Sequence, residues 1–260
     1  SGGSVSNAGD VNGDGFDDLI VGADAHDTNG DYYSDYSGSS YVVFGKASGF
    51  SAAMDLSSLN GSNGFRLDGE AAYDHSGLSV STAGDVNGDG FDDLIVGAPF
   101  ASRNDSLSGS SYVVFGQASG FSATMDLSSL NGNNGFRLDG EVYDYSGRSV
   151  SNAGDVNGDG FDDLIVGAPI ASPYGTSSGS SYVVFGQASG FSATMNLSSL
   201  DGSNGFRLDG ETAFDQSGRS VSTAGDVNGD GFDDLIVGAY RADPNGSGSG
   251  SSYIIFGRSD

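Results

Sequence analysis

The chain has 260 residues, 45 of them glycine, and 35 Asp and Glu against 9 Lys and Arg give it a formal net charge of −26. So acidic a chain is repelled by nucleic acids and by anionic membrane surfaces, and neither is expected as a partner. The sequence has no cysteine, which excludes disulfides and thiolate metal sites, and no apolar run approaches the roughly 18 residues of a membrane span, so membrane insertion is not expected.

One long motif occurs four times along the chain. It reads Gly-Asp-Val-Asn-Gly-Asp-Gly-Phe-Asp-Asp-Leu-Ile-Val-Gly-Ala, and its copies begin their acidic part at Asp10, Asp85, Asp155 and Asp226. Shorter motifs recur between the copies in a constant order, which indicates a repeat architecture. We predict a single domain over residues 1–260, with repeat units at 1–75, 76–145, 146–216 and 217–260.

Each unit contains four short segments typical of β-strands. The first, as in Ser149–Ala153, has small residues that suit a strand near a crowded propeller axis. The second, Asp-Leu-Ile-Val-Gly-Ala, is a continuous apolar run expected where both faces are covered, and Tyr-Val-Val-Phe-Gly follows as the third. The fourth, as in Phe136–Asp139, alternates apolar and charged residues, which suits an outer edge. Its repeated arginines are expected to pair with local carboxylates: Arg66, Arg137 and Arg207.

These segments predict an all-β fold, a β-propeller of four-stranded antiparallel blades with one blade per repeat. A solenoid is the alternative, although solenoid repeats are usually shorter, at roughly 20–45 residues. The sequence ends just after the third strand of the last unit, at Phe256-Gly257, so the last blade is predicted to lack its outer strand. Self-association through that open edge is expected, whereas closure of four blades alone, pairing with a second chain into a larger ring and membership of a longer array all stay open.

The loop between the first and second strands carries the candidate chemistry. In the first unit it runs from Asp10 to Asp18, with side-chain oxygens at positions 1, 3, 5 and 9, Gly15 at the sharp turn of position 6, and the carbonyl of Phe16 at position 7. Such a set of oxygens, three of them carboxylates, suits Ca²⁺ better than Mg²⁺, which demands a tighter octahedron, so about four Ca²⁺ ions are expected, one per repeat. The predicted ligands are Asp10, Asn12, Asp14, Phe16 and Asp18; Asp85, Asn87, Asp89, Phe91 and Asp93; Asp155, Asn157, Asp159, Phe161 and Asp163; Asp226, Asn228, Asp230, Phe232 and Asp234.

Two other interpretations of these loops compete with a calcium site. An EF-hand would need a bidentate Glu at position 12, where Val21 lies, and helical flanks, whereas the flanks here resemble strands. A plain Asp/Asn/Gly turn with solvated charges is the second interpretation. Three carboxylates within one short loop repel each other strongly unless a cation lies among them, which favours the metal site.

The repeats closely resemble the FG-GAP repeats of integrin α-subunit propellers and of their bacterial relatives. The Gly-Ala-Pro part of the family signature is present at Gly97-Ala98-Pro99 and Gly167-Ala168-Pro169, and the acidic loops match the family pattern Asp-x-Asp-x-Asp-Gly-x-x-Asp, with Asn at the second ligand position. The resemblance implies calcium at the base of the blades, partner binding on the opposite face and an extracellular or cell-surface location. Integrins close a ring of seven blades, whereas four units are present here, and no adhesion domain is inserted among them.

The connections between second and third strands differ most among the units, and a protein or glycan partner is expected to bind there, opposite the calcium loops. The first of them, Asp24 to Gly38, is the longest, and the turns between units, such as Glu70 to Gly77, share that face. A solvated loop without a ligand is the alternative. The candidate ligand-binding residues are Asp24, Asp27, Asp31, Tyr32, Tyr33, Asp35 and Tyr36.

Few residues suit catalysis. Histidine occurs only at His26 and His75, and Asp74, His75 and Ser76 are neighbours in a turn, which is poor geometry for a catalytic triad. We therefore predict that the chain is not an enzyme but a calcium-binding extracellular β-propeller for adhesion, protein interaction or surface scaffolding. The alternatives are a lectin-like glycan-binding propeller and an accessory domain of a larger secreted enzyme.

Overall fold

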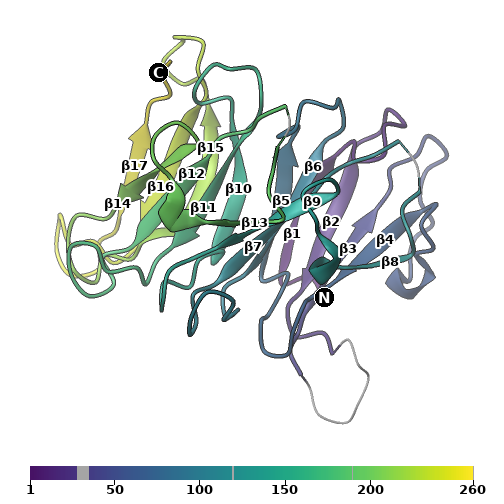
Figure 1. Cartoon of the computed structure of the whole chain (residues 1–260), viewed down its shortest axis with the longest axis horizontal. Coiled ribbons are helices and arrows are strands. Elements are labelled where there is room, and N and C mark those ends of the chain that lie inside the picture. The colour runs from purple at the N-terminus through teal and green to yellow at the C-terminus, as the bar shows by residue number, and fades with distance from the viewer. Residues whose placement is uncertain (28–34, 119, 189, 260) are drawn as a thin grey trace.

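The computed structural model describes residues 1–27, 35–118, 120–188 and 190–259. Over these residues the chain forms four β-sheets, one for each repeat (Figure 1), which confirms the all-β prediction. Short 3₁₀-helices lie in the connections: η1 (Leu56–Ser58), η2 (Leu127–Ser129) and η3 (Leu197–Ser199). No helix among the described residues is long and apolar enough to cross a membrane.

Each sheet is one blade, in which consecutive strands pair antiparallel. Blade 1 contains β1 (Ser4–Gly9), β2 (Asp18–Ala23), β3 (Ser39–Val43) and β4 (Gly64–Asp68), and blade 2 contains β5 (Ser79–Gly84), β6 (Asp93–Ala98), β7 (Ser110–Val114) and β9 (Gly135–Asp139). Blade 3 contains β10 (Ser149–Gly154), β11 (Asp163–Ala168), β12 (Ser180–Val184) and β14 (Gly205–Asp209), and blade 4 contains β15 (Ser217–Gly225), β16 (Asp234–Ala239) and β17 (Ser251–Ile255). Blade 4 has no fourth strand among the described residues, which confirms the prediction of an incomplete last blade.

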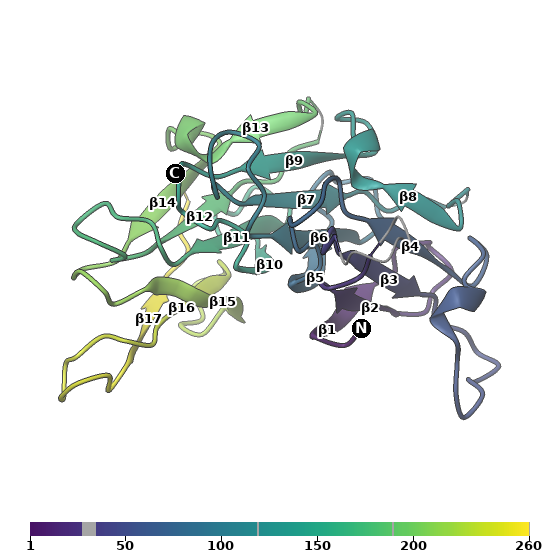
Figure 2. The same ribbon diagram turned by 90° about the horizontal axis from the view of Figure 1, so that it is seen from below.

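The composition of the strands matches their positions in the blades. The first strands β1, β5, β10 and β15 contact one another in succession along the inner side of the arc in Figure 2, where small Ser and Ala side chains let the blades converge. The second strand of blade 2, β6, is buried along its whole length. A continuous apolar run is stable there because neighbouring blades cover both of its faces.

The outer strands of blades 1 and 2 are not open edges, which corrects the expectation drawn from their charged residues. β8 (Thr124–Asp126) belongs to the second unit but pairs in parallel with β4, and β13 (Thr194–Asn196) of the third unit pairs in parallel with β9. At the first of these contacts, Arg66 N donates to the carbonyl of Ala123 at 2.9 Å, and Phe121 stacks on Phe65 with ring centroids 4.4 Å apart. A segment of the second unit and a segment of the third unit therefore cover the outer edge of the preceding blade.

The hydrophobic core lies between the blades. We call the face that a blade turns toward the next blade its leading face, and the face turned toward the previous blade its trailing face. Between blades 1 and 2, Ile20 and Val42 on a leading face pack in one cluster with Leu94 and Tyr112 on a trailing face. Equivalent clusters join blade 2 to blade 3 and blade 3 to blade 4. Figure 2 shows the resulting arc, with blades 1 and 4 at its two ends.

Neighbouring backbones approach closely at one glycine of the second strand. A Cβ added to Gly97 would lie 2.1 Å from the carbonyl oxygen of Gly147, which begins the next blade, whereas a Cβ added to Gly238 of blade 4 would meet its nearest atom at 3.6 Å. Only glycine therefore permits the observed distance between blades at Gly97, while alanine fits at Gly238.

We predict that Gly97→Ala lowers the free energy of unfolding by about 1–3 kcal/mol, because the added methyl group overpacks the contact between blades 2 and 3. Urea unfolding at high dilution measures the change. Gly238→Ala is the matched control, and its free energy of unfolding is expected to stay near that of the wild type. Equal losses in the two variants would show that close approach between blades is not the cause.

Candidate metal centres and the opposite loop face

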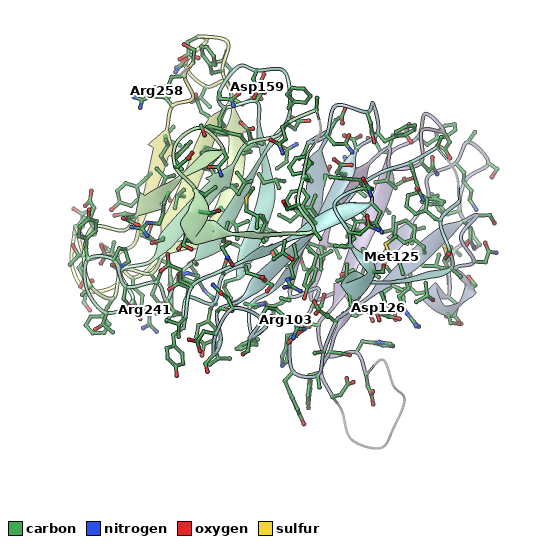
Figure 3. The ribbon with its side chains drawn as sticks, viewed as in Figure 1. Arg103, Met125, Asp126, Asp159, Arg241 and Arg258 are labelled. Carbon is green, nitrogen blue, oxygen red and sulfur yellow. The ribbon has the colours of Figure 1, made fainter. Side chains whose placement is uncertain are left out.

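The four acidic loops lie together at one end of the strands. Each connects the first and second strands of its blade, as from β10 to β11 in blade 3. Figure 3 labels Asp159 in that loop, and it labels Arg103 and Arg241, from connections between second and third strands, at the other end. The loops predicted to bind calcium and those predicted to bind a partner are therefore separated by the length of the strands.

Side chains organise each acidic loop through hydrogen bonds to its own backbone. Asp10 accepts from Asp14 N at 3.0 Å through Oδ1 and from Gly15 N at 2.8 Å through Oδ2. Asn12 Oδ1 also accepts from Asp14 N at 2.9 Å, and Asp14 Oδ1 accepts from Phe16 N at 3.0 Å. Gly15 has a φ of +87°, a left-handed conformation that suits glycine at the predicted sharp turn. The same bonds recur in the loops that begin at Asp85, Asp155 and Asp226.

The aspartate at the ninth position is the buried member of each set. Asp18 is fully buried, and its Oδ2 accepts from Val11 N at 3.1 Å while its Oδ1 accepts from Gly45 N at 2.7 Å. This carboxylate joins the start of the loop to the end of the third strand. Equivalent pairs of hydrogen bonds are made by Asp93, Asp163 and Asp234.

Burial opposes the negative charge of these ninth-position aspartates. Loss of solvent raises the pKa of Asp93 to about 8 and that of Asp163 to about 7, although hydrogen bonds from the backbone act in the opposite direction. Burial, with a smaller contribution from the charges of Asp14 and Asp10, raises the pKa of Asp18 to about 6. A cation beside these groups would favour their ionised forms.

The donor chemistry of the loops fits Ca²⁺. The hydrogen bonds described above use one lone pair on each carboxylate oxygen of Asp10 and Asp18, so a second lone pair on each oxygen is available to an ion. The carboxylates point toward backbone N–H groups of their own loops. In this arrangement, no three acidic or imidazole side chains within the described residues form a group that could hold a metal ion. The ligand set of Asp10, Asn12, Asp14, Asp18 and the carbonyl of Phe16, with its three counterparts, therefore stays a prediction.

The eighth position of the loop, which is absent from the predicted ligand set, joins neighbouring blades. Asp92 Oδ2 accepts from Asp10 N of the preceding loop at 2.8 Å, and the ring of Phe91 lies so close to Gly13 that no Cβ would fit there. The sequence pattern that could have indicated this role is the aspartate at the eighth position of every unit. A turn that faces only solvent does not require an aspartate there. The same bond to the preceding loop is made by Asp162 and Asp233.

At the opposite end, the described part of the first long connection is held against the turn that follows β4. Asp24 Oδ2 lies 3.3 Å from His75 Nδ1, and Tyr36 stacks on the same imidazole with ring centroids 5.3 Å apart. These contacts bring two of the candidate partner-binding residues together on one histidine. Of the other candidates, Asp27 and Asp35 lie in the same connection, whereas Asp31, Tyr32 and Tyr33 lie outside the described residues.

Charged residues at this end form local ion pairs instead of a catalytic arrangement. Asp74 pairs with Arg103, His75 contacts Asp24, and the buried hydroxyl of Ser76 has no hydrogen-bond partner within the described residues, so the three candidates for a triad do not converge. The repeated arginines pair as predicted with the aspartate two residues later: Arg66 with Asp68 at 2.7 Å, Arg137 with Asp139 at 2.9 Å and Arg207 with Asp209 at 2.7 Å.

The same units are recognised by comparison with known proteins. A family model described as the FG-GAP repeat matches residues 1–43, 76–114, 146–184 and 217–255. Each match covers the first three strands and the acidic loop of one blade. The chain belongs to the FG-GAP repeat family. The resemblance inferred from the Gly-Ala-Pro and acidic-loop motifs is thereby confirmed.

Similar FG-GAP proteins include integrin α-subunits of several animals. Integrin alpha-V of Gallus gallus is 30% identical over 242 residues, which are 90% of this chain and 20% of the relative. Integrin alpha pat-2 of Caenorhabditis elegans is 32% identical over 197 residues, 74% of this chain and 15% of the relative. Integrin alpha-IIb of Mus musculus is 34% identical over 186 residues, which are 68% of this chain and 16% of the relative. The chain thus spans a fifth or less of the length of these relatives.

We predict that an FG-GAP loop needs its ninth-position aspartate even without metal. In Asp93→Asn the side-chain nitrogen replaces one acceptor, so the N–H of Val86 or of Gly116 loses its partner. With chelator present throughout, and at a pH above the raised pKa of Asp93 so that its carboxylate is ionised, the free energy of unfolding is expected to fall by about 1–3 kcal/mol, the cost of one buried unsatisfied donor. Chemical unfolding followed by circular dichroism measures this change.

Asp17→Asn is the control for this prediction, because no described residue donates a hydrogen bond to the Asp17 carboxylate. Its free energy of unfolding is expected to stay unchanged in chelator. An unchanged value for Asp93→Asn as well would mean that the two backbone bonds contribute nothing to the stability of the loop.

Proposed function

We propose that the chain is a calcium-binding, extracellular interaction module, in which FG-GAP blades support a partner-binding surface at the end opposite the acidic loops. We call this end of the blades the loop end. The proposal rests on one repeated observation: three of the four units with an acidic loop at one end of the blade have an exposed aromatic residue at an equivalent turn at the other end. The similarity to integrin α-subunits supports the extracellular location and the role in adhesion or scaffolding.

Calcium binding is supported by the constancy of the donor set. Four loops present the same five oxygens, and the same backbone hydrogen bonds shape each loop. In the first loop, the hydrogen bonds of Asp10 and Asp14 hold two carboxylates within one turn, and their charges act on the buried Asp18. A hard cation with flexible oxygen coordination, such as Ca²⁺, would relieve this repulsion.

Partner binding at the loop end is supported by three aromatic residues at equivalent turns, which we call the aromatic row: Tyr73, Tyr143 and Phe214. They are 63%, 57% and 59% exposed, and their φ values are +68°, +61° and +72°. Each turn is fixed by a hydrogen bond that the backbone N–H of the aromatic residue donates to a carbonyl oxygen. That oxygen belongs to the connection between the second and third strands of the same unit. A left-handed φ is uncommon for a bulky residue and costs about 1–3 kcal/mol. A turn that only connected two strands would form more easily with Gly or Asn, so the aromatic residues favour a role in binding.

A protein is the first candidate partner and a glycan the second. Exposed aromatic rings on fixed turns supply contact area at a small cost in side-chain entropy, which suits a protein interface. The same rings offer flat faces on which a sugar can stack, which is the observation in favour of the glycan. The two candidates differ in selectivity, since a glycan-binding surface discriminates among sugars on an array.

We predict that calcium raises the thermal midpoint of unfolding and that chelator lowers it. Each saturated site is expected to add about 4 kcal/mol when free Ca²⁺ exceeds its dissociation constant roughly a thousandfold. Differential scanning calorimetry in excess Ca²⁺ and in chelator measures the shift. Identical midpoints under the two conditions would exclude a structural role for calcium.

A matched pair of variants assigns the calcium effect to the loops. Asp89→Asn removes a predicted ligand carboxylate and is expected to lower the calcium stoichiometry by one site in isothermal titration calorimetry. Asp17→Asn alters an aspartate outside the predicted ligand set and is expected to leave the stoichiometry unchanged. Loss of the same number of sites in both variants would point to diffuse charge as the origin of binding.

We predict that the aromatic row carries the partner contact. The triple variant Tyr73→Ser, Tyr143→Ser and Phe214→Ser removes the exposed rings and is expected to abolish the binding that the wild type shows on a glycan array or on a peptide array. Phe50→Ser, which removes an exposed ring from the connection between β3 and β4 at the acidic-loop end, is the control and is expected to retain binding. Equal binding by the triple variant and the wild type would place the partner site elsewhere.

A further inference from the structure

A glutamate and an aspartate in the turn after an outer strand face the next blade, and the first two junctions between blades differ at this acidic pair. At the junction of blades 1 and 2, Glu70 and Asp74 bind the guanidinium of Arg103, which Figure 3 labels at the loop end. At the junction of blades 2 and 3, the equivalent acids are Glu141 and Asp144. We propose that this second pair binds the guanidinium of an arginine that a protein partner supplies.

The first junction shows how such a pair binds a guanidinium. Arg103 Nε lies 3.3 Å from Glu70 Oε2, and Arg103 Nη2 donates a hydrogen bond to Asp74 Oδ2. Tyr112 OH donates to Glu70 at 3.0 Å, and Arg137 Nη1 lies 2.9 Å from the same carboxylate oxygen. The side chains of Arg103 and Asp74 are only 18% and 5% exposed. One planar cation therefore pairs with two acids at once, as the fork of N–H groups on a guanidinium allows.

The connection between the second and third strands of blade 3 follows the same course as that of blade 2 but lacks the arginine. In each connection, a backbone N–H near the end donates at 2.9 Å to the hydroxyl of a serine near the start, which is Ser102 in blade 2 and Ser172 in blade 3. The next residue is Arg103 in blade 2 and Pro173 in blade 3. Because the backbone bonds are alike, a proline ring replaces the guanidinium at the second junction.

A cavity of about 320 Å³ lies beside Pro173, and the two acids of the second pair are among its lining residues. Asp144 is only 8% exposed, and its Oδ2 accepts a hydrogen bond from Tyr182 OH at 3.1 Å. Over the described parts of the chain, no cationic side chain forms an ion pair with Asp144. A carboxylate that is so deeply buried is stabilised in its charged form by a cation in contact with it.

The glutamate of the second pair also lacks a close cation. Glu141 is 45% exposed, against 20% for Glu70, and its ion-pair partner within the described residues is Arg207 Nη1 at 4.0 Å. Arg207 is the counterpart of Arg137 and is thus common to both junctions. The two junctions therefore differ by the cation of Arg103, and a guanidinium from outside the chain is the group that fits the second one.

An arginine side chain suits the cavity better than the ammonium group of lysine. A guanidinium is planar and weakly hydrated and can pair with both acids, whereas an ammonium group is a compact, strongly hydrated point charge. Tyr174, which is 69% exposed, also lines the cavity and offers its ring to a cation that enters. The net charge of −26 attracts a basic partner from a distance. This inference deepens the proposed partner binding at the loop end and rests on it, but it does not depend on calcium binding.

An NMR titration of the 260-residue chain at physiological ionic strength tests the proposal. The probe is Nα-acetyl-arginine methylamide, which carries the arginine side chain without charged ends, and the uncharged citrulline analogue is its control. The arginine probe is expected to shift the backbone amide signals of Ser172 and Tyr174 until they saturate, with a dissociation constant on the order of 1 mM. The citrulline analogue is expected to bind about tenfold more weakly or less, because it cannot form the ion pairs.

Three variants assign the binding to the cavity. Asp144→Asn removes the buried charge and is expected to weaken binding of the arginine probe about tenfold or more. Pro173→Arg lets the chain supply the guanidinium itself and is expected to block the probe while both acids stay in place. Asp105→Asn removes an exposed charge from the equivalent connection of blade 2 and is expected to bind the probe like the wild type. Circular dichroism checks that each variant folds.

Undiminished binding of the arginine probe by Pro173→Arg would overturn the inference, because the probe would then be held by the overall negative charge and not by the cavity. Signal shifts spread over the whole acidic surface would do the same. The result is separable from that of the aromatic row. Loss of array binding in the triple variant with probe binding retained supports both proposals, whereas array binding by a wild type that does not bind the probe overturns this inference alone.

Discussion

Packing of one blade against the next is the constraint on which the rest of the structure depends. A blade of three or four short strands is apolar on both faces, so it cannot bury its own core and needs a neighbour on each side. Ile20 and Val42 are fully buried only because blade 2 covers them, and Gly97 is required because the backbone of blade 3 comes so close. The outer edge of blade 1 also depends on a neighbouring unit, because β8 of the second unit pairs with β4.

The acidic loops contribute to the packing between blades, in addition to any role in binding a metal ion. Asp93 ties its loop to the end of a third strand, and Asp92 ties it to the loop of the preceding blade. The geometry of an acidic loop and that of the blade junction are therefore linked, so that an ion bound in a loop, as proposed, would also order the junction beside it.

The acidic loops of the candidate site could be located from the sequence, because the predicted ligands follow one another along the chain. The positions of Asp10, Asn12, Asp14 and Asp18, and the turn at Gly15, are set by local spacing. The aromatic row was not predicted as a partner surface, since the left-handed φ and exposure of Tyr73 depend on a backbone bond to a different connection. The role of Asp92 was also hidden, because its partner lies in another repeat.

The sequence by itself determined the number of repeats, the four strand types and the spacing of the acidic residues in the loops, because each is encoded within one unit by short-range patterns. Tertiary structure alone decided how the units meet. The parallel pairing of β8 and β13 with the preceding blade, the division of every blade into leading and trailing faces, and the arc in which the blades follow one another all come from contacts between units. Identical residues such as Leu19 and Leu94 differ in burial only through their neighbours, which no local pattern in the chain can express.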